Sequence, residues 1–169
     1  MRRRIILMRH AKSSWQTGVS DHERPLNNRG RKDAPRIAQR LVHLQWVPEL
    51  VHSSDSARTR ETWSAIAPVF GRDIHVSFHR ELYLAGIGAA ETVLEGVSST
   101  IGTVLLLGHN PGWEDICAAW TGQRIQMTTA NAVLLESSSA NWVDAVHGAS
   151  QWQIQDVLRP RPPRDAIPK

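Results

Sequence analysis

Two short and wholly apolar runs constrain the fold of this chain more than any other feature. Residues 5–8 and 104–107 contain only Ile, Leu, Met and Val, as strands buried on both faces of a parallel sheet do. Between and after these runs, apolar residues recur three and four positions apart, which predicts amphipathic helices. Strands that alternate with helices indicate an α/β fold. We expect a single three-layer domain with a mostly parallel central sheet and helices on both faces.

The expected elements follow one another with short connections. Strands are predicted at residues 5–8, 50–52, 75–78, 103–107, 131–136 and 152–158, and helices at 30–45, 56–70, 89–98 and 111–120. Asp55 or Ser56 is expected to cap the second helix. Pro35 should lie in the first turn of its helix, and Asn110 should cap the helix that Pro111 begins. The polar stretch 12–28 is long enough to form a loop over a site.

Length and composition fit one globular domain. The chain has 169 residues, of which 41% are hydrophobic and 21% charged, and this is ordinary usage for a domain with a real core. We assign residues 1–158 to the domain and expect the tail 159–169, rich in Pro and Arg, to be extended or mobile. A single cysteine, Cys117, excludes an intramolecular disulfide and favours a cytoplasmic protein.

The charge balance and the N-terminus exclude several classes of partner. Lys and Arg total 20 against 16 Asp and Glu, but the excess is concentrated near the two chain ends, so we expect a solvated basic surface and no nucleic-acid site. The apolar run before Arg9 is too short for an export signal, and no stretch is long enough to cross a membrane. The oligomeric state stays open.

Two histidines and two arginines are candidates for a phosphoryl-transfer site. His10 follows Arg9 after the first apolar run, His109 follows the second run, and Arg58 stands at a predicted helix start. The carboxyl ends of parallel strands meet at one edge of a sheet, so these residues should converge. Arginine forks and a helix N-terminus suit a phosphoryl group, and a neutral histidine can attack phosphorus. His109 would donate a hydrogen bond, most strongly when protonated, and the arrangement requires no metal or other cofactor.

Four segments resemble the histidine phosphatase superfamily, and within it the SixA-type phosphohistidine phosphatases. They are Leu7-Met8-Arg9-His10-Ala11-Lys12-Ser13-Ser14-Trp15, Arg24-Pro25-Leu26-Asn27-Asn28-Arg29-Gly30, the stretch 54–62, and Gly108-His109-Asn110-Pro111-Gly112. Ala11, Lys12 and Gln16 replace the residues typical of the phosphoglycerate mutase branch, which argues against mutase activity. The resemblance implies a phosphoglycerate-mutase-like fold and a phosphatase that forms a phosphohistidine intermediate on His10. Arg9, Arg58 and His109 would bind phosphate.

The substrate and the proton donor have alternatives. The resemblance favours phosphohistidine on a protein partner, and a small phosphomonoester is the alternative. Glu81 could face the pocket and protonate an ester leaving group, or it could be a surface carboxylate paired with Arg80. A second mechanism would use Asp21, His22, His10 and His109 as zinc ligands, although Arg9 would repel the cation. A binding module without enzymatic activity is the third possibility.

The tryptophans and the remaining histidines lie outside the candidate site residues. Trp63, Trp113 and Trp120 fall on predicted apolar helix faces, and Trp15 should lie near the pocket. Trp46, Trp142 and Trp152 are expected to be surface or interface groups. No role is assigned to the histidines outside the motifs, which are His43, His52, His75, His79 and His147.

Overall fold

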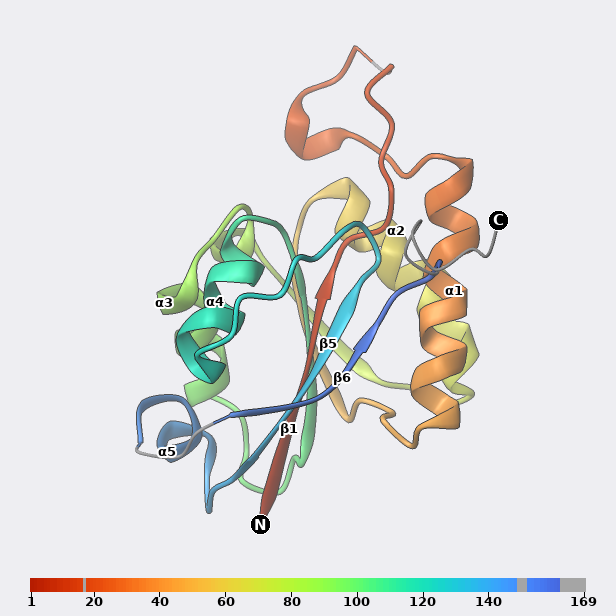
Figure 1. Cartoon of the computed structure of the whole chain (residues 1–169). Helices are drawn as coiled ribbons and strands as arrows, with labels where there is room; N and C mark the ends of the chain where they lie inside the picture. Colours follow the sequence, from red (N-terminus) through yellow and green to blue (C-terminus); the bar gives the residue numbers. More distant parts are fainter. Residues whose placement is uncertain (17, 149–151, 162–169) are drawn as a thin grey trace, which may run out of the picture.

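The computed structural model describes residues 1–16, 18–148 and 152–161, and these form a sheet between two helical layers (Figure 1). The sheet has six strands in the order β3-β2-β4-β1-β5-β6. The strands are β1 Arg2–Arg9, β2 Leu50–Ser54, β3 His75–His79, β4 Thr103–Gly108, β5 Ala132–Ser138 and β6 Gln153–Leu158. Neighbours among β3, β2, β4 and β1 are parallel, whereas β5 runs antiparallel to β1 and β6. The predicted α/β fold with a mostly parallel sheet is confirmed.

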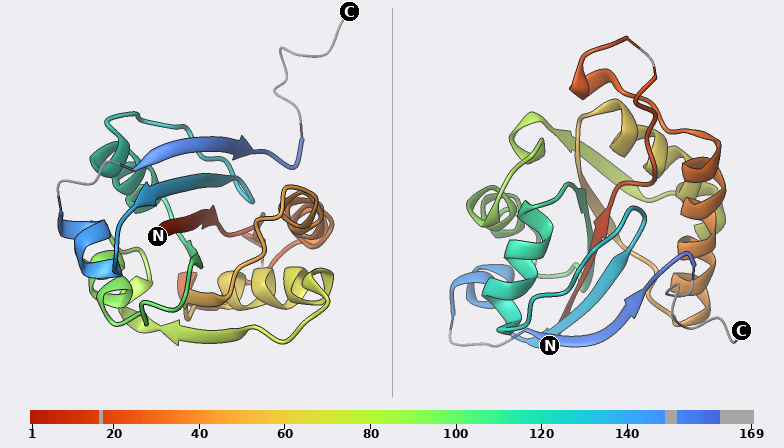
Figure 2. Two further views of the ribbon diagram at one scale, coloured as in Figure 1. Left: turned by 90° about the horizontal axis from the view of Figure 1, so that it is seen from below. Right: turned by 45° about the horizontal axis from the view of Figure 1, so that its top comes forward.

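The two faces of β1 bury different cores. Ile5 and Leu7 belong to the core beneath α3 Ile87–Glu95, α4 Gly112–Thr121 and α5 Trp142–His147. Ile6 and Met8 pack on the opposite side against α1 Asn28–His43 and α2 Ala57–Ile66. Figure 2 shows these two helical groups on either side of the sheet. Burial on both faces explains why this run lacks the alternation of a half-exposed strand.

Two helices differ from the prediction because of proline and capping. Helix α1 begins at Asn28, where the Asn27 side chain accepts a hydrogen bond from the Gly30 backbone N–H at 2.9 Å. Pro35 therefore lies well inside the helix, and its expected place in the first turn was wrong. Ser56 caps α2 as predicted, but α2 ends at Ile66 and continues as the 3-10 helix η2, Ala67–Phe70. Pro68 lacks the N–H that an α-helix would need there.

The start of α4 also differs. Pro111 is itself the cap residue and α4 begins at Gly112, so the prediction that Asn110 caps this helix was wrong. The Asn110 amide instead donates to Glu114 Oε1 and to the Met127 carbonyl, both at 2.8 Å. Asn110 thus ties the loop before β5 to the first turn of α4.

The three tryptophans expected at the surface are buried, so that expectation was wrong. Helix α5, which the sequence analysis did not predict, places the Trp142 ring against Trp152 at 6.4 Å, and Trp152 packs on Trp120 at 5.7 Å. Trp46 closes the opposite core near the end of α1. These rings bury large apolar area, and together they extend both cores to the end of the sheet remote from His10.

The described part of the tail contacts α1 and the loop before β5. Arg161 Nε lies 3.3 Å from Asp33 Oδ1, and Arg159 donates to the Gln126 carbonyl at 3.4 Å. The rest of the tail that was expected to be extended, residues 162–169, lies outside the described residues. Within the described ranges, no helix has the length and apolar character needed to span a membrane.

Candidate active site

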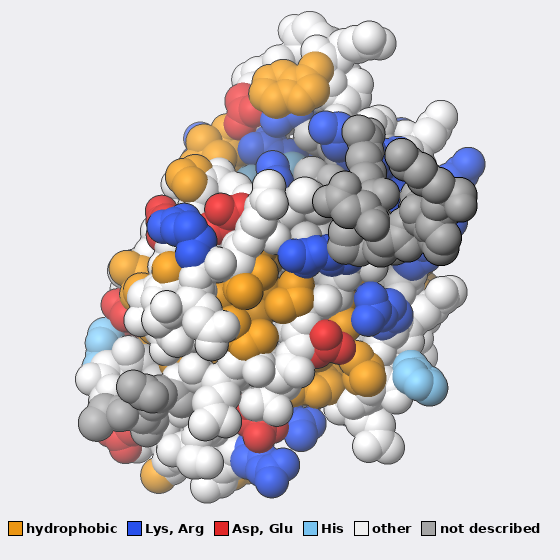
Figure 3. Space-filling model, in the orientation of Figure 1, with side chains coloured by type: hydrophobic (Ala, Val, Ile, Leu, Met, Phe, Trp, Pro, Cys, Tyr) orange, Lys and Arg blue, Asp and Glu red, His pale blue; other side chains and the backbone are white. Residues whose placement is uncertain are grey.

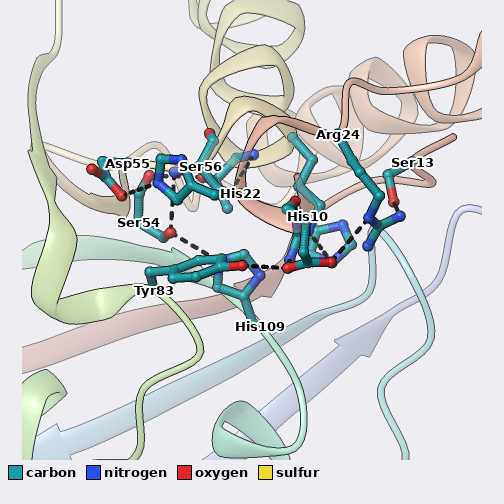
Figure 4. Close-up of polar contacts among 12 residues, drawn as sticks. His10, Ser13, His22, Arg24, Ser54, Asp55, Ser56, Tyr83 and His109 are labelled. Atoms are coloured by element: carbon teal, nitrogen blue, oxygen red, sulfur yellow. Dashed lines mark hydrogen bonds and ion pairs between the residues drawn. The ribbon is translucent and has the colours of Figure 1, made fainter. Parts of the chain in front are cut away.

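The first pair of site residues meets where β1 and β4 end side by side. Arg9 is paired in register with Gly108, and the His10 backbone N–H donates to the Gly108 carbonyl at 3.0 Å. This register also brings the next two residues together, and the ring centroids of His10 and His109 lie 5.3 Å apart (Figure 4). Both side chains are nearly buried, with 6% and 1% exposure. The parallel register thus brings together two histidines that are far apart in the chain.

Arg58 joins this pair from the first turn of α2. Strand β2 ends at Ser54, and Ser56 caps the helix by accepting from the Thr59 N–H. The Arg58 guanidinium is 2% exposed, and its Nε donates to His10 Nε2 at 3.3 Å. The guanidinium at the positive end of α2 therefore lies against the ring of His10.

The hydrogen bonds of His10 define its tautomer. His10 Nδ1 lies 2.7 Å from the Ala11 carbonyl oxygen, which can only accept, so Nδ1 carries the proton. Nε2 then holds the lone pair that faces Arg58. Burial, together with the neighbouring cations Arg58 and Arg9, holds the pKa of His10 well below its usual value. At neutral pH the ring is uncharged and Nε2 is free to attack an electrophile.

Among the described residues, one ring nitrogen of His109 has a hydrogen-bond partner and the other has none. Its Nε2 lies 2.8 Å from Ser54 Oγ, which accepts from the Ser56 N–H and has its own hydrogen left to donate to the ring. With Ser54 donating to Nε2, Nδ1 carries the ring proton. Among the described residues, this buried Nδ1 has no hydrogen-bond partner. Burial and Arg58 lower the pKa of His109 to about 3. The expected donor is thus neutral at neutral pH and would donate through Nδ1.

Arg9 completes the positive wall of the site. One Nη donates to the Met127 carbonyl at 2.9 Å, and within the described chain the buried Nε lacks a partner. Burial lowers the pKa of Arg9, while Glu114 opposes this effect. The side chain remains a cation at neutral pH. Of the five residues predicted from the sequence, four are therefore brought together, namely Arg9, His10, Arg58 and His109.

Two residues that were not predicted to bind phosphate, Asp21 and Tyr83, contact Arg58. Asp21, in the 3-10 helix η1 Asp21–Glu23, accepts from Arg58 Nη2 at 3.1 Å and from Arg24 Nε at 3.0 Å. The hydroxyl of Tyr83, the sole tyrosine of the chain, also donates to Asp21. This bond and the two arginines hold the pKa of Asp21 far below its usual value. A carboxylate thus accepts from Nη2 of Arg58.

Neither residue had a clear signal in the sequence. Asp21 lies three positions before Arg24, where the segment that resembles the family begins. The sequence indicated Asp21 only as an alternative metal ligand. Tyr83 follows two positions after Glu81, in the segment that was expected to reach the pocket. Burial and the Asp21 carboxylate raise the pKa of Tyr83, so the hydroxyl keeps the proton that it donates. The segment reaches the pocket through Tyr83.

Glu81 itself lies apart from these contacts. It is exposed in the 3-10 helix η3 Arg80–Leu82, and the structure does not bring it together with the other four predicted residues. The described residues show no ion pair between Glu81 and Arg80 either. Glu81 as the proton donor therefore stays a prediction.

The alternative metal ligands have other partners. Asp21 pairs with Arg58, and His22 Nε2 lies 2.7 Å from Asp55 Oδ1. His10 Nδ1 faces the Ala11 carbonyl. No group of three His, Cys, Asp or Glu side chains in the described ranges is arranged to hold a metal ion. The geometry suits an anion between cationic and hydrogen-bond-donating groups.

Comparison with protein families identifies the group. Residues 5–93 match the family model of the histidine phosphatase superfamily (branch 1). The chain belongs to the histidine phosphatase superfamily. This histidine phosphatase is also 36% identical, over 94% of its length and 78% of the relative, to an uncharacterized chloroplastic protein of Arabidopsis thaliana.

Solved structures place this histidine phosphatase in the SixA type. A protein from Nakamurella multipartitia, provisionally named phosphohistidine phosphatase SixA, superposes with a TM-score of 0.80 at 26% identity, covering 95% of this chain and 97% of the other. A similarly named protein from Agrobacterium tumefaciens gives 0.78 and 27%, covering 93% and 97%. The fold and family make this protein a phosphatase.

Proposed function

We propose that this protein is a phosphohistidine phosphatase that transfers the phosphoryl group of its substrate to Nε2 of His10. One observation carries the proposal: the Ala11 carbonyl fixes the proton on Nδ1, which leaves the Nε2 lone pair facing the guanidinium that would hold the phosphoryl oxygens. Arg9 and Arg58 bind these oxygens as forked donors. His109 donates to them through its unoccupied Nδ1.

The first step exchanges one phosphorus–nitrogen bond for another. The bond from phosphorus to the substrate imidazole breaks as the bond from phosphorus to His10 Nε2 forms. The substrate reacts with its ring protonated on the second nitrogen, so that the ring leaves as neutral imidazole. On His10 the Nδ1–H stays bonded to the Ala11 carbonyl, which stabilises the phosphorylated ring.

The second step releases phosphate and restores His10. A water molecule attacks phosphorus, the bond to Nε2 breaks with its electron pair returning to Nε2, and the proton lost by water leaves with phosphate or solvent. The low pKa of His10 makes the neutral ring a good leaving group. No metal ion or other cofactor takes part in these two steps.

The charge state of Asp21 favours phosphohistidine over an alkyl phosphate. An alkoxide leaves slowly without a general acid, and such assistance is commonly worth about 10² to 10⁴ in rate. Asp21 is the carboxyl group that contacts Arg58, and its low pKa keeps it ionised and unable to donate at neutral pH. Imidazole leaves without this help, which supports phosphohistidine on a protein as the substrate.

The proposal also covers the setting of the enzyme. We assign the phosphatase to residues 1–158 and treat 159–169 as an appended tail. Cys117 is buried and free, which suits a reducing compartment, and the proposed location is the cytoplasm.

A substrate panel at matched concentrations tests the substrate class. Free phosphohistidine, a phosphohistidine peptide, p-nitrophenyl phosphate and an alkyl phosphate are incubated with the wild-type protein and with Glu81→Gln. We expect the phosphohistidine compounds to give the highest kcat/KM, with little effect of Glu81→Gln. A preferred alkyl phosphate, together with a loss of about 10² in Glu81→Gln, would establish a small-molecule phosphomonoesterase that uses Glu81 as its acid.

A further inference from the structure

Large apolar side chains are exposed in two segments that border the site. Trp15 and Val19 belong to the loop between β1 and α1 and are 72% and 46% exposed. Leu84 belongs to the loop between β3 and α3 and is 55% exposed. We call these three side chains the apolar rim. Exposed apolar groups gathered at one place indicate contact with another molecule more often than scattered ones do.

Contacts with site residues locate Trp15 and Leu84 at the pocket. The Arg24 guanidinium stacks 3.5 Å from the centre of the Trp15 ring, and the same Arg24 holds Asp21 against Arg58. Leu84 directly follows Tyr83, whose ring packs edge-on against His109 at 5.4 Å. Figure 1 shows the loop after β1 rising beyond the carboxyl end of that strand. In Figure 3 an apolar side chain lies at this end of the molecule beside acidic and basic groups.

The backbone of Leu84 adds a second observation. Its φ is 52°, in the left-handed region that branched apolar residues rarely adopt. Leu84 thus combines an unfavourable backbone conformation with an exposed apolar side chain. Such combinations persist where a function needs the side chain in that place.

Two exposed arginines lie over aromatic rings of β3 and of the segment that leads to Leu84, and one of them, Arg60, also donates to the Asp55 backbone carbonyl. Arg80 is exposed and lies over the Tyr83 ring at 5.1 Å, and Arg60 is exposed and lies over Phe78 at 4.1 Å. Among the described residues, neither guanidinium has a carboxylate partner. Their charge therefore remains available to an acidic surface.

We propose that the apolar rim, with Arg60 and Arg80 beside it, is the docking surface for the protein that carries the phosphohistidine. This inference rests on the proposed function. His10, Arg58 and His109 are almost fully buried, so the substrate must enter as a projecting side chain. The rim then contacts the surface around that side chain, and charge complementarity requires apolar and acidic residues there.

The test compares a small and a large probe on the same variants. The small probe is free phosphohistidine. The large probe is a helical carrier domain phosphorylated with phosphoramidate on one surface histidine that stands among leucine and glutamate side chains. The rim variants are Trp15→Ala and Leu84→Asn, the second chosen because asparagine tolerates the left-handed backbone. Val143→Ala, at an exposed valine of α5, truncates an apolar side chain at the opposite end of the molecule.

The expected result separates docking from chemistry. Each rim variant should lower kcat/KM on the carrier by about tenfold or more, as loss of an aromatic or apolar anchor does at protein interfaces, while turnover of free phosphohistidine and the Val143→Ala control stay at the wild-type level. A carrier with lysines in place of the glutamates should be a correspondingly poorer substrate. Equal losses on both probes, or no loss on the carrier, would overturn the docking surface. The proposed function is tested separately by the wild-type protein: if the wild type does not hydrolyse free phosphohistidine, the proposed function is wrong.

Discussion

Arg58 uses three different nitrogens of one guanidinium. Its Nε contacts His10 Nε2, its Nη1 donates to the Asp21 carbonyl at 2.6 Å, and its Nη2 pairs with the Asp21 carboxylate. A lysine would keep the charge but offers a single nitrogen on a flexible stem. The geometry of the fork, rather than its charge alone, therefore determines how the site holds an oxyanion.

Arg58→Lys should lower kcat/KM by about 10² or more, because the directed contacts to phosphoryl oxygens and to His10 are lost. Steady-state kinetics on free phosphohistidine measures the effect. Arg40→Lys, at an exposed arginine of α1, is the matched control and should keep wild-type activity. Wild-type kinetics in Arg58→Lys would remove this residue from the site.

Asp21 pairs with the guanidinium of Arg58 that would bind the phosphoryl group, so we expect the carboxylate to compete with an oxyanion. Asp21→Asn removes the negative charge but keeps an oxygen that accepts from Arg58, so an entering oxyanion meets less repulsion. The inhibition constant of orthovanadate should fall by about tenfold. Glu23→Gln, which removes a charge from the same 3-10 helix, should leave it unchanged. Weaker vanadate inhibition in Asp21→Asn would show that the carboxylate orients Arg58 for binding.

At the scale of elements, the start of α1 is fitted closely to the chain after His10. The Asn27 N–H donates to the Lys12 carbonyl at 2.9 Å, and a Cβ on Gly30 would stand 2.2 Å from that same oxygen. A side chain at position 30 would push the helix away from the loop that carries Asp21. The close packing of one backbone segment on another thus explains why a glycine stands at position 30.

Gly30→Ala should destabilise the protein by about 2 kcal/mol or more, since neither backbone segment can move cheaply. Denaturant unfolding measures the change. Gly88→Ala in α3, where a Cβ meets nothing within 4 Å, should instead be neutral or stabilising by up to about 1 kcal/mol. Equal stability of the two variants would contradict the close fit at Gly30.

The success of prediction differed between local and distant interactions. The apolar runs in β1 and β4 identified both central strands, because burial on two faces leaves a direct mark in the residues themselves. Helix α5 and the burial of its Trp142 were not predictable from the local sequence, because this burial depends on Trp152 in a later segment. Tyr83 meets Asp21 across 62 positions of sequence, and neither residue shows that pairing locally. The convergence of His10 and His109 was predictable because parallel register alone produces it.

For the molecule as a whole, buried histidines link stability to pH. Burial, together with His79 and His75, lowers the pKa of His52 to about 4, and its Nδ1 lies 2.8 Å from His79 Nε2. Between pH 6.5 and about 4 the unfolded chain binds a proton at this position that the folded protein does not. The free energy of unfolding must therefore fall as the pH decreases through this window.

His52→Asn should flatten this pH dependence. Urea unfolding from pH 7.5 to 4 should show a slope that is smaller than in the wild type by up to about 1.4 kcal/mol per pH unit below pH 6.5. At pH 7.5 this histidine is neutral in both the folded and the unfolded protein. The difference in unfolding free energy between the wild type and His52→Asn at that pH serves as the reference for the lower pH values. A parallel pair of stability curves across the whole range would contradict a buried, neutral His52.

The central claim is that Nε2 of His10 carries the phosphoryl group during turnover. Mixing the protein with excess phosphohistidine, quenching within milliseconds at alkaline pH and digesting for mass spectrometry measures this directly. We expect one phosphate on the peptide that contains His10, attached at Nε2 by the ³¹P shift of the denatured protein, and none in His10→Ala, which should also be inactive. Phosphate on another residue, or full turnover by His10→Ala, would contradict the account.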